Sequence, residues 1–191
     1  MTPLSIPGSW SVDNTVHGDH RGEFVEWFKA PELEKITGRS LNLAQANMSK
    51  STKGTLRGIH FADVPLGQAK YITCVVGSII DFVVDIRVGS PTFGSWDAVE
   101  LSGSKRNAVF LEEGLGHAFL ALEDDTVVTY LVTDIYRPDK EHGINPLDPA
   151  LGLTFPLSAS ELELSAKDRE APTLEEARQA GLLPIWSEQE G

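Results

Sequence analysis

The chain has 191 residues, of which 41% are hydrophobic and 23% are charged. These values are typical of one globular domain with a sizeable core, and they exclude extended disorder. The formal net charge of −12 argues against a general binder of nucleic acids or anionic membranes, although a small anionic ligand can still occupy a local basic pocket.

The number of cysteines and the first residues of the chain indicate the cellular compartment of the protein. Cys74 is the only cysteine, so an intrachain disulfide is impossible, and so is a zinc site built from two or four cysteines of one chain. The start, MTPLSIPGSW, has neither the basic region nor the apolar run of a signal peptide. No stretch approaches the roughly 18 apolar residues of a membrane helix. We therefore expect a soluble, cytoplasmic protein that crosses no membrane.

The predicted elements begin with a hairpin. Residues 8–28 alternate in polarity around the turn signal GDHRG at 18–22, which predicts two antiparallel strands. Residues 31–38 begin with proline and end with glycine, which predicts a short helix. Further strands are predicted at 41–48, 55–61, 70–76, 79–87, 94–101, 108–111, 117–122 and 126–132.

Beyond residue 136 the chain is loop-like and rich in proline, with one further helix. Thr173 and Glu176 form a capping-box pattern at the start of that helix, and Gly181 closes it. Many short strands with close turns predict an antiparallel sandwich or barrel. We expect a single all-β domain, residues 1–191, with a few short peripheral helices and a C-terminal wrap over about residues 137–191.

The stretch 56–70, LRGIHFADVPLGQAK, places an arginine, a histidine and a lysine close together. Such a group suits an anionic ligand that carries a carbonyl; the alternative is a surface hairpin with solvated charges. On a period of two, Lys70 shares a strand face with Ile72 and Cys74. A lysine on an apolar face is costly unless it meets an anion or has a function.

His60, His117 and Tyr130 also lie within apolar strand segments. A buried histidine or tyrosine is often a core residue with satisfied polar atoms, so a structural role stays open for each of them. Strict alternation puts Arg57 and His60 on opposite faces of one strand. Gly58 between them can mark a bulge that turns one of the two side chains. In a regular strand only one of them could reach a shared cavity.

These residue types suit proton transfer next to a carbonyl group. The reaction needs a base that works near neutral pH, for which His60 is the candidate. Lys70 can stabilise the enolate that forms at the carbonyl oxygen. Inversion of a stereocentre needs an acid on the opposite face, and Tyr130, on another strand, is the candidate. The reaction requires no cofactor.

Metal-dependent and nucleophilic chemistry fit the sequence less well. A histidine metal site in a small β-barrel would need a His-x-His pair, whereas Phe61 and Ala62 follow His60, so we predict no metal site. Cys74 lies in the middle of an apolar strand, and neither a G-x-S-x-G turn nor a phosphate-binding glycine loop occurs.

Several motifs, in order along nearly the whole chain, carry a family resemblance. They are D-x-R-G at 19–22, Q-x-N at 45–47, R-G-I-H at 57–60, Q-x-K at 68–70, D-I-R-x-x-S-P-T-F-G at 85–94, G-H-A-F at 116–119 and L-S-x-K-D at 164–168. With these motifs the chain resembles the dTDP-4-dehydrorhamnose 3,5-epimerase family, which consists of cofactor-free sugar-nucleotide epimerases with a cupin-like antiparallel jelly-roll barrel.

The resemblance implies roles for the residues in these motifs. His60 would remove the proton next to the C4 ketone of dTDP-4-keto-6-deoxyglucose, and Asp168 would pair with it. Lys70 would stabilise the enolate, and Tyr130 would be the acid. The residues that would bind the sugar, the diphosphate and the nucleotide are Arg21, Glu26, Gln45, Ala46, Asn47, Arg57, Lys70, His117, Tyr136, Glu141 and Lys167.

The resemblance also implies a homodimer. Family members exchange their N-terminal region with a partner, so about residues 1–50 would cross over, and Arg21 and Glu26 would act on the neighbour's ligand. The chain departs from rhamnose-pathway members at residues 59, 61 and 62, and segments 145–152 and 175–184 look more like the antibiotic deoxysugar branch. Some enzymes of that branch invert only C3 or only C5, so the inverted centre and the final sugar stay open. The alternative hypotheses are a metal-dependent cupin oxygenase or sugar isomerase, and a non-catalytic nucleotide-sugar binding module.

Overall fold

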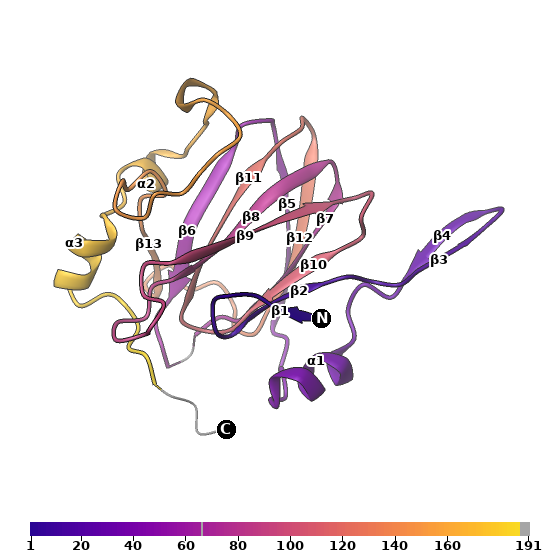
Figure 1. Ribbon diagram of the computed structural model, residues 1–191, viewed down its shortest axis with the longest axis horizontal. Helices are drawn as coiled ribbons and strands as arrows, with labels where there is room; N and C mark the ends of the chain where they lie inside the picture. The colour runs from indigo at the N-terminus through magenta and orange to yellow at the C-terminus, as the bar shows by residue number, and fades with distance from the viewer. Residues whose placement is uncertain (66, 188–191) are drawn as a thin grey trace.

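Two antiparallel β-sheets pack face to face and form a cupin-like barrel (Figure 1). The computed structural model describes residues 1–65 and 67–187, so residue 66 and the last four residues of the predicted wrap lie outside the described residues. One sheet has the order β1 (Thr2–Pro3), β2 (Ser9–Val12), β10 (Ala108–Leu111), β7 (Lys70–Val76), β12 (Thr126–Val132) and β5 (Gln45–Ser51). The other has the order β13 (Glu141–Gly143), β6 (Leu56–Ala62), β11 (Leu115–Ala121), β8 (Ser78–Asp85) and β9 (Trp96–Ser102). The predicted all-β class is confirmed.

The strand bounds differ from the predicted ones where pairing overrides the local pattern. β5 begins at Gln45 rather than at residue 41, because Gln45 pairs with Val132, the last residue of its neighbour β12. The strands β1 and β13 were not predicted from the sequence. β13 exists because Glu141 and the two following residues pair with the end of β6, where Glu141 lies opposite Ala62.

The described α-helices are short and lie outside the sheets. They are α1 (Ala30–Thr37), α2 (Ala166–Arg169) and α3 (Leu174–Gln179), and a 3₁₀ turn, η1 (Ala159–Glu161), precedes α2. Helix α1 has proline in its first turn and ends at Gly38 with φ of +71°, as the sequence predicts. Helix α3 has the predicted capping box between Thr173 and Glu176. Within the described part of the chain, none of the helices is long and apolar enough to cross a membrane.

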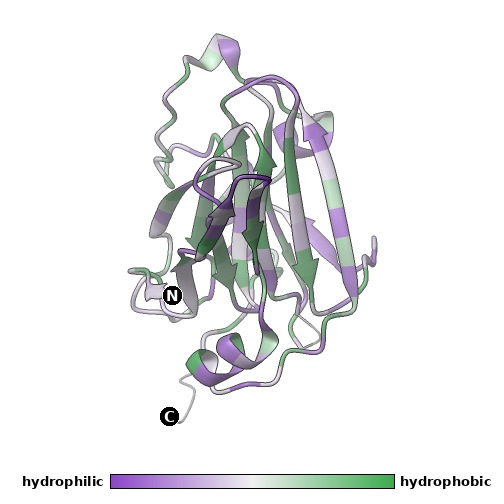
Figure 2. Cartoon of the chain, turned by 90° about the vertical axis from the view of Figure 1, so that its right-hand side faces the viewer, coloured by the Kyte–Doolittle hydropathy of each residue, from purple (hydrophilic) through white to green (hydrophobic). Residues whose placement is uncertain are grey.

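The main core lies between the two sheets, where alternate residues of each strand point inward. On β7 the buried Ile72 and Cys74 belong to this core, and Lys70 is on the same strand face. Figure 2 shows hydrophobic residues concentrated along the strands of the barrel. Toward one end of the barrel, polar side chains replace the apolar ones between the sheets, and a cavity begins there.

Segments from both ends of the chain cover the outer faces of the barrel. The C-terminal wrap packs Leu174 and Leu183 in the same cluster as Phe82 of the five-stranded sheet, and Figure 1 shows α2 and α3 on that side of the barrel. On the outside of the six-stranded sheet, the indole of Trp27 lies 6.0 Å from the ring of Tyr71. The packing of the C-terminal wrap on the five-stranded sheet brings α2 next to β6, and this places Asp168 of α2 beside His60 of β6.

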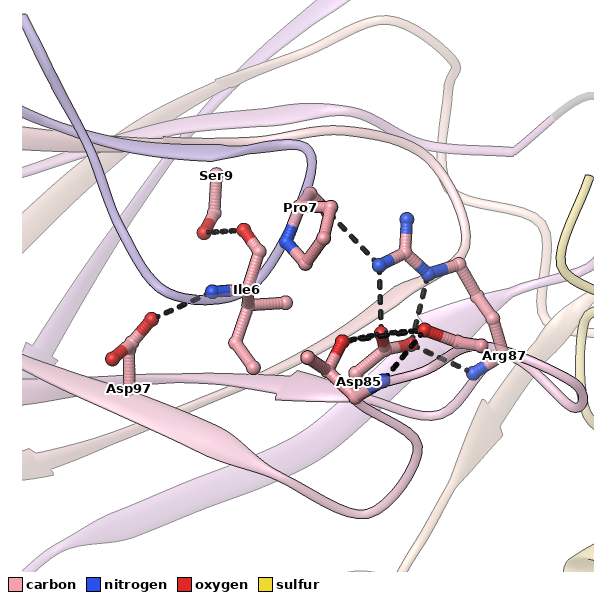
Figure 3. Close-up of polar contacts among 8 residues, drawn as sticks. Ile6, Pro7, Ser9, Asp85, Arg87 and Asp97 are labelled. Carbon is pink, nitrogen blue, oxygen red and sulfur yellow. Dashed lines mark hydrogen bonds and ion pairs between the residues drawn. The ribbon is translucent and has the colours of Figure 1, made fainter. Parts of the chain in front are cut away.

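The D-I-R-x-x-S-P-T-F-G motif closes the turn after β8, and Figure 3 shows the polar contacts of its residues Asp85 and Arg87. The buried Asp85 carboxylate accepts hydrogen bonds from Nε and Nη2 of Arg87 and from the hydroxyls of Ser90 and Thr92. Arg87 also donates to the carbonyl of Pro7 at 2.9 Å, which ties the N-terminal loop to this turn. Burial alone would raise the pKa of Asp85, but these donors hold it below its ordinary value. The motif is therefore structural.

An N-terminal hairpin extends away from the barrel (Figure 1), but it is shorter than the predicted range 8–28, because Ser9–Val12 forms β2 and pairs with β10 of the six-stranded sheet. It consists of β3 (Val16–Asp19) and β4 (Gly22–Val25), and nearly all of its residues are exposed. Phe24 is 64% exposed. Among the ion pairs of the described residues, Glu23 with Arg106 at 3.1 Å is the one that links the two strands to the barrel. A two-stranded hairpin with so little support is marginally stable in water.

Candidate active site

The cavity between the sheets has a volume of about 220 Å³ and adjoins a second cavity of about 260 Å³. The first is lined by Asn47, Ser49, Arg57, His60, Gln68, Lys70, His117, Phe119, Tyr130, Tyr136 and Glu141. The second shares part of this lining and adds Thr55, Leu56, Ser165, Lys167 and Asp168. The four predicted catalytic residues thus lie around one continuous site.

A bulge in β6 turns Arg57 and His60 toward this site. His60 pairs with His117 of β11, and Arg57 pairs with Phe119. Between these two pairs, β6 has two residues, 58 and 59, whereas β11 has one, residue 118. In a regular strand the side chains of Arg57 and His60 would lie on opposite faces. The extra residue on β6 brings both to the same face.

Gly58 fits this bulge because it has no side chain. Its φ is +111°, a conformation that other residues rarely adopt. A Cβ at this position would overlap the carbonyl oxygen of His117 and would lie 2.8 Å from the Cβ of Ala118. The close approach of β6 to β11 therefore requires the glycine of the R-G-I-H motif.

His60 forms a hydrogen-bonded pair with Asp168, as the family resemblance implies. Nε2 of His60 lies 2.6 Å from Oδ1 of Asp168, whose own amide N–H donates to the side chain of Ser165 at the start of α2. Burial alone would raise the pKa of Asp168, but the hydrogen bond and charge of His60, together with the donors from Ser165 and the Gly58 amide, hold it below its ordinary value. An ionised Asp168 orients the imidazole and stabilises its protonated form.

His117 forms a second histidine–carboxylate pair beside the first. Its Nε2 lies 2.7 Å from Oδ2 of Asp81, which is fully buried. Burial raises the pKa of Asp81, and His117 opposes that shift only in part. Because His117 lies opposite His60 across the β6–β11 pair, Asp81 orients a side chain that lines the cavity directly.

Lys70 points into the cavity, as its place in the strand alternation predicts. It is 5% exposed, and its ammonium donates to Oε1 of Gln68. Burial lowers the pKa of Lys70 to about 8, although the charge of Glu141 partly opposes this. The cavity thus contains a cation that can approach a ligand oxygen.

Tyr130 lies on the wall opposite His60. It belongs to β12 of the six-stranded sheet, whereas His60 belongs to β6 of the five-stranded sheet. Burial and the charge of Glu141 raise the pKa of Tyr130, and Arg57 opposes this. The phenol therefore keeps its proton at neutral pH, and a ligand between the sheets would have the imidazole on one side and the phenol on the other.

The edge strand β5 and the loop after β12 border the same site. Nε2 of Gln45 donates to Oδ1 of Asn47 at 2.6 Å, and the amide N–H of Tyr136 donates to Oε1 of Gln45. The side chain of Ala46 is exposed on the opposite face of the strand. Glu141 of β13 lines both cavities, and Lys167 of α2 lines the second, which we call the outer cavity.

Two predicted binding residues lie away from the cavity of their own chain. Arg21, in the turn of the β3–β4 hairpin, pairs with Asp19 at 2.5 Å. Glu26, just after the hairpin, pairs with Lys29 at 2.6 Å. Neither lines the two cavities.

The arrangement offers acid–base groups rather than a set of metal ligands. Among residues 1–65 and 67–187, no group of three or more histidine, cysteine, aspartate or glutamate side chains is placed to hold a metal ion. His60 and His117 each use Nε2 to contact a carboxylate.

Comparison with known proteins identifies the family. The family model described as dTDP-4-dehydrorhamnose 3,5-epimerase matches residues 3–176, which is most of the chain. The chain belongs to this epimerase family. It is 50% identical over 185 residues to a dTDP-4-dehydrorhamnose 3,5-epimerase of Mycolicibacterium smegmatis, a match that covers 97% of this chain and 90% of the relative.

Monofunctional epimerases are similar to this epimerase to nearly the same degree. A dTDP-4-dehydro-6-deoxyglucose 3-epimerase of a Streptomyces species is 47% identical over 193 residues, which cover 100% of this chain and 98% of the relative. A crystal structure of ChmJ, a 3′-monoepimerase of Streptomyces bikiniensis, superposes with a TM-score of 0.93 at 46% identity and covers 97% of this chain and 93% of that chain. That structure is a histidine-to-asparagine, tyrosine-to-phenylalanine double mutant in complex with dTDP.

Several residues that contribute to the site of the epimerase were not among the predicted site residues. Ser49 and Phe119 line the cavity, and Asp81 supports His117. The available signal was strand alternation, which puts Ser49 on the face of Asn47 and puts Asp81 on one face with Val83. Alternation does not say which face of a strand points inward, so it could not select these residues.

Proposed function

We propose that this epimerase acts on dTDP-4-keto-6-deoxy-D-glucose without a cofactor and inverts C3, C5 or both, in the cytoplasmic biosynthesis of rhamnose or of an antibiotic deoxysugar. Relatives named as 3-epimerases and as 3,5-epimerases support the substrate class. Because both kinds are similar to this chain, the proposal includes inversion at C3 and at C5. The dTDP complex of the similar 3′-monoepimerase supports a thymidine nucleotide as the carrier of the sugar.

The reaction begins with removal of a proton from the carbon next to the C4 ketone. His60 takes the proton, and the electron pair of the C–H bond forms the double bond of an enolate whose negative charge develops on O4. Lys70 stabilises that charge. Tyr130 then delivers a proton to the opposite face of the same carbon, so the carbonyl returns and the centre is inverted. One proton leaves the substrate and one enters it.

The observation that carries this proposal is the position of the paired His60 and of Tyr130 on opposite walls of one cavity that also holds Lys70. A base and an acid on opposite sides of a bound ring are what inversion requires. In the outer cavity, Arg57 and Lys167 supply positive charge for a diphosphate. Exposed Tyr136 offers a ring on which thymine can stack, and Gln45, the Ala46 backbone, Asn47 and Glu141 border the nucleotide.

Proton exchange with the solvent tests the function directly. The purified protein is incubated with dTDP-4-keto-6-deoxyglucose in D₂O without added metal, and the sugar is followed by NMR. We expect deuterium to enter at C3, C5 or both, because each cycle replaces a carbon-bound proton with one from the solvent. Stabilisation of the protein by dTDP without any exchange would indicate a binding module instead. Exchange that a chelator abolishes and added metal restores would indicate a metal-dependent enzyme.

We further propose that the protein is a homodimer in which the N-terminal region, about residues 1–50, reaches the partner. The exposed β3–β4 hairpin supports this, because Phe24 and the rest of its surface would be covered by a second copy. In such a dimer Arg21 and Glu26, which lie away from the cavity of their own chain, would act on the partner's nucleotide.

Mixed dimers test this exchange. Arg21→Ala and His60→Ala are each expected to impair the homodimer. When the two variants are co-expressed and the heterodimer is isolated, one of its sites carries both changes and the other carries neither. We therefore expect the heterodimer to recover about half of the wild-type rate, measured at low substrate concentration. If Arg21 served its own chain, both sites would be defective, and the heterodimer would show no recovery.

A further inference from the structure

Along the inward face of β5, one polar side chain is left without a partner. Gln45 and Asn47 bind each other, and Ser51 accepts a hydrogen bond from Nε of Arg57 at 3.2 Å. Ser49 lies between them on the same face and lines the cavity. Its Oγ is buried and has no hydrogen-bond partner within residues 1–65 and 67–187.

A buried hydroxyl without a partner destabilises a folded protein, and native structures contain few such groups. Positions that break this rule are expected at functional sites, where a ligand supplies the missing contact. A hydroxyl both donates and accepts, so the group that suits Ser49 is another hydroxyl. The substrate of the proposed function carries such groups on its sugar ring.

The register of the six-stranded sheet places Ser49 relative to the reacting centre. Lys70 pairs with Val132, two residues after Tyr130 on β12. Ser49 pairs with Val128, two residues before Tyr130. Along the barrel, Tyr130 therefore lies between Lys70 and Ser49.

The sugar ring has groups in the same order. With the C4 oxygen at Lys70 and C3 beside Tyr130, the next ring carbon is C2, which bears a hydroxyl. We propose that Ser49 hydrogen-bonds the C2 hydroxyl of the substrate and selects 2-hydroxy sugars over 2-deoxy sugars. This inference rests on the proposed function.

The C2 hydroxyl also suits a fixed contact better than the C3 hydroxyl does. Inversion at C3 moves the C3 hydroxyl from one side of the ring to the other, so a single immobile partner could hold only one epimer. C2 does not react. A hydrogen bond from Ser49 to its hydroxyl can therefore hold the ring before and after either inversion, and it contributes to binding without opposing the reaction.

The test compares two substrates in two proteins. kcat/KM for deuterium exchange is measured with dTDP-4-keto-6-deoxyglucose and with its 2-deoxy analogue, for the wild type and for Ser49→Ala. Loss of one hydrogen bond predicts a decrease of about fivefold to tenfold on the 2-hydroxy sugar. On the 2-deoxy sugar we expect a change of less than about twofold, because the partner of Ser49 is absent.

Ser9→Ala is the matched control. Ser9 is buried and donates to the carbonyl of Ile6 at 2.7 Å, and it does not line the cavities. We expect this variant to melt at a lower temperature with unchanged substrate preference, whereas Ser49→Ala should melt no lower than the wild type because it loses no hydrogen bond in the free protein. An equal loss on both sugars in Ser49→Ala, or no loss on either, would overturn the inference alone. Absence of exchange in the wild type would instead overturn the proposed function.

Discussion

Replacing His60 with alanine is expected to slow deuterium exchange into the substrate by about 10²-fold to 10⁴-fold, because loss of a general base ordinarily has an effect of this size. The rate is measured by NMR in D₂O with dTDP-4-keto-6-deoxyglucose at saturating concentration. Binding of dTDP should persist in the variant, because His60 meets the sugar and not the nucleotide in the proposed function. The pattern of lost exchange with retained binding separates a missing base from a misfolded protein.

A third histidine–aspartate pair, between His142 and Asp63, offers a matched control for this experiment. Nε2 of His142 lies 2.6 Å from Oδ1 of Asp63, the same distance between the same atoms as in the His60–Asp168 pair, but His142 does not line the cavities. His142→Ala should therefore exchange within about twofold of the wild-type rate. Full exchange in His60→Ala would exclude this residue as the base, and an equal loss in both variants would point to a general structural effect.

Replacing Lys70 with methionine is expected to lower kcat by about 10²-fold to 10³-fold, since it removes the cation that stabilises the developing charge on O4. The pH dependence gives a second readout. Burial lowers the pKa of Lys70 to about 8, with Glu141 in partial opposition, and only the protonated amine carries the charge that the enolate needs. The contribution of the Lys70 charge should therefore be complete well below pH 8, and wild-type activity should fall as the pH rises through about 8.

In Lys70→Met this alkaline decrease should disappear along with most of the activity, which is checked by measuring kcat from pH 6 to 10. The raised pKa of Tyr130 keeps its ionisation from mimicking the decrease near pH 8. Lys50→Met is the control, because Lys50 is an exposed side chain on β5, in the same sheet as Lys70, and pairs with Asp125. An unchanged pH profile in Lys70→Met, or activity that rises above pH 8 in the wild type, would contradict the role of this lysine.

Strand alternation explains how much of the fold could be predicted. β7, β10 and β12 have the predicted bounds, and Lys70 faces the interior as expected, because side chains of a strand alternate whatever surrounds the strand. The predicted strand bounds were wrong, or a strand was missed, where pairing with a neighbouring strand rather than the local sequence pattern determines the strand. β5 starts four residues late to match the end of β12, and β1 and β13 form by pairing alone.

The sequence alone established the barrel class, the family resemblance and three candidates for proton transfer: His60, Lys70 and Tyr130. The family resemblance implied that Asp168, 108 residues from His60, pairs with it, and the tertiary structure shows the contact itself, at 2.6 Å. The structure also decided that a bulge turns Arg57 to the same site. Periodicity is local and can be read from neighbouring residues, whereas these contacts depend on how the C-terminal wrap and the strands β6 and β11 pack. That packing is a property of the whole chain.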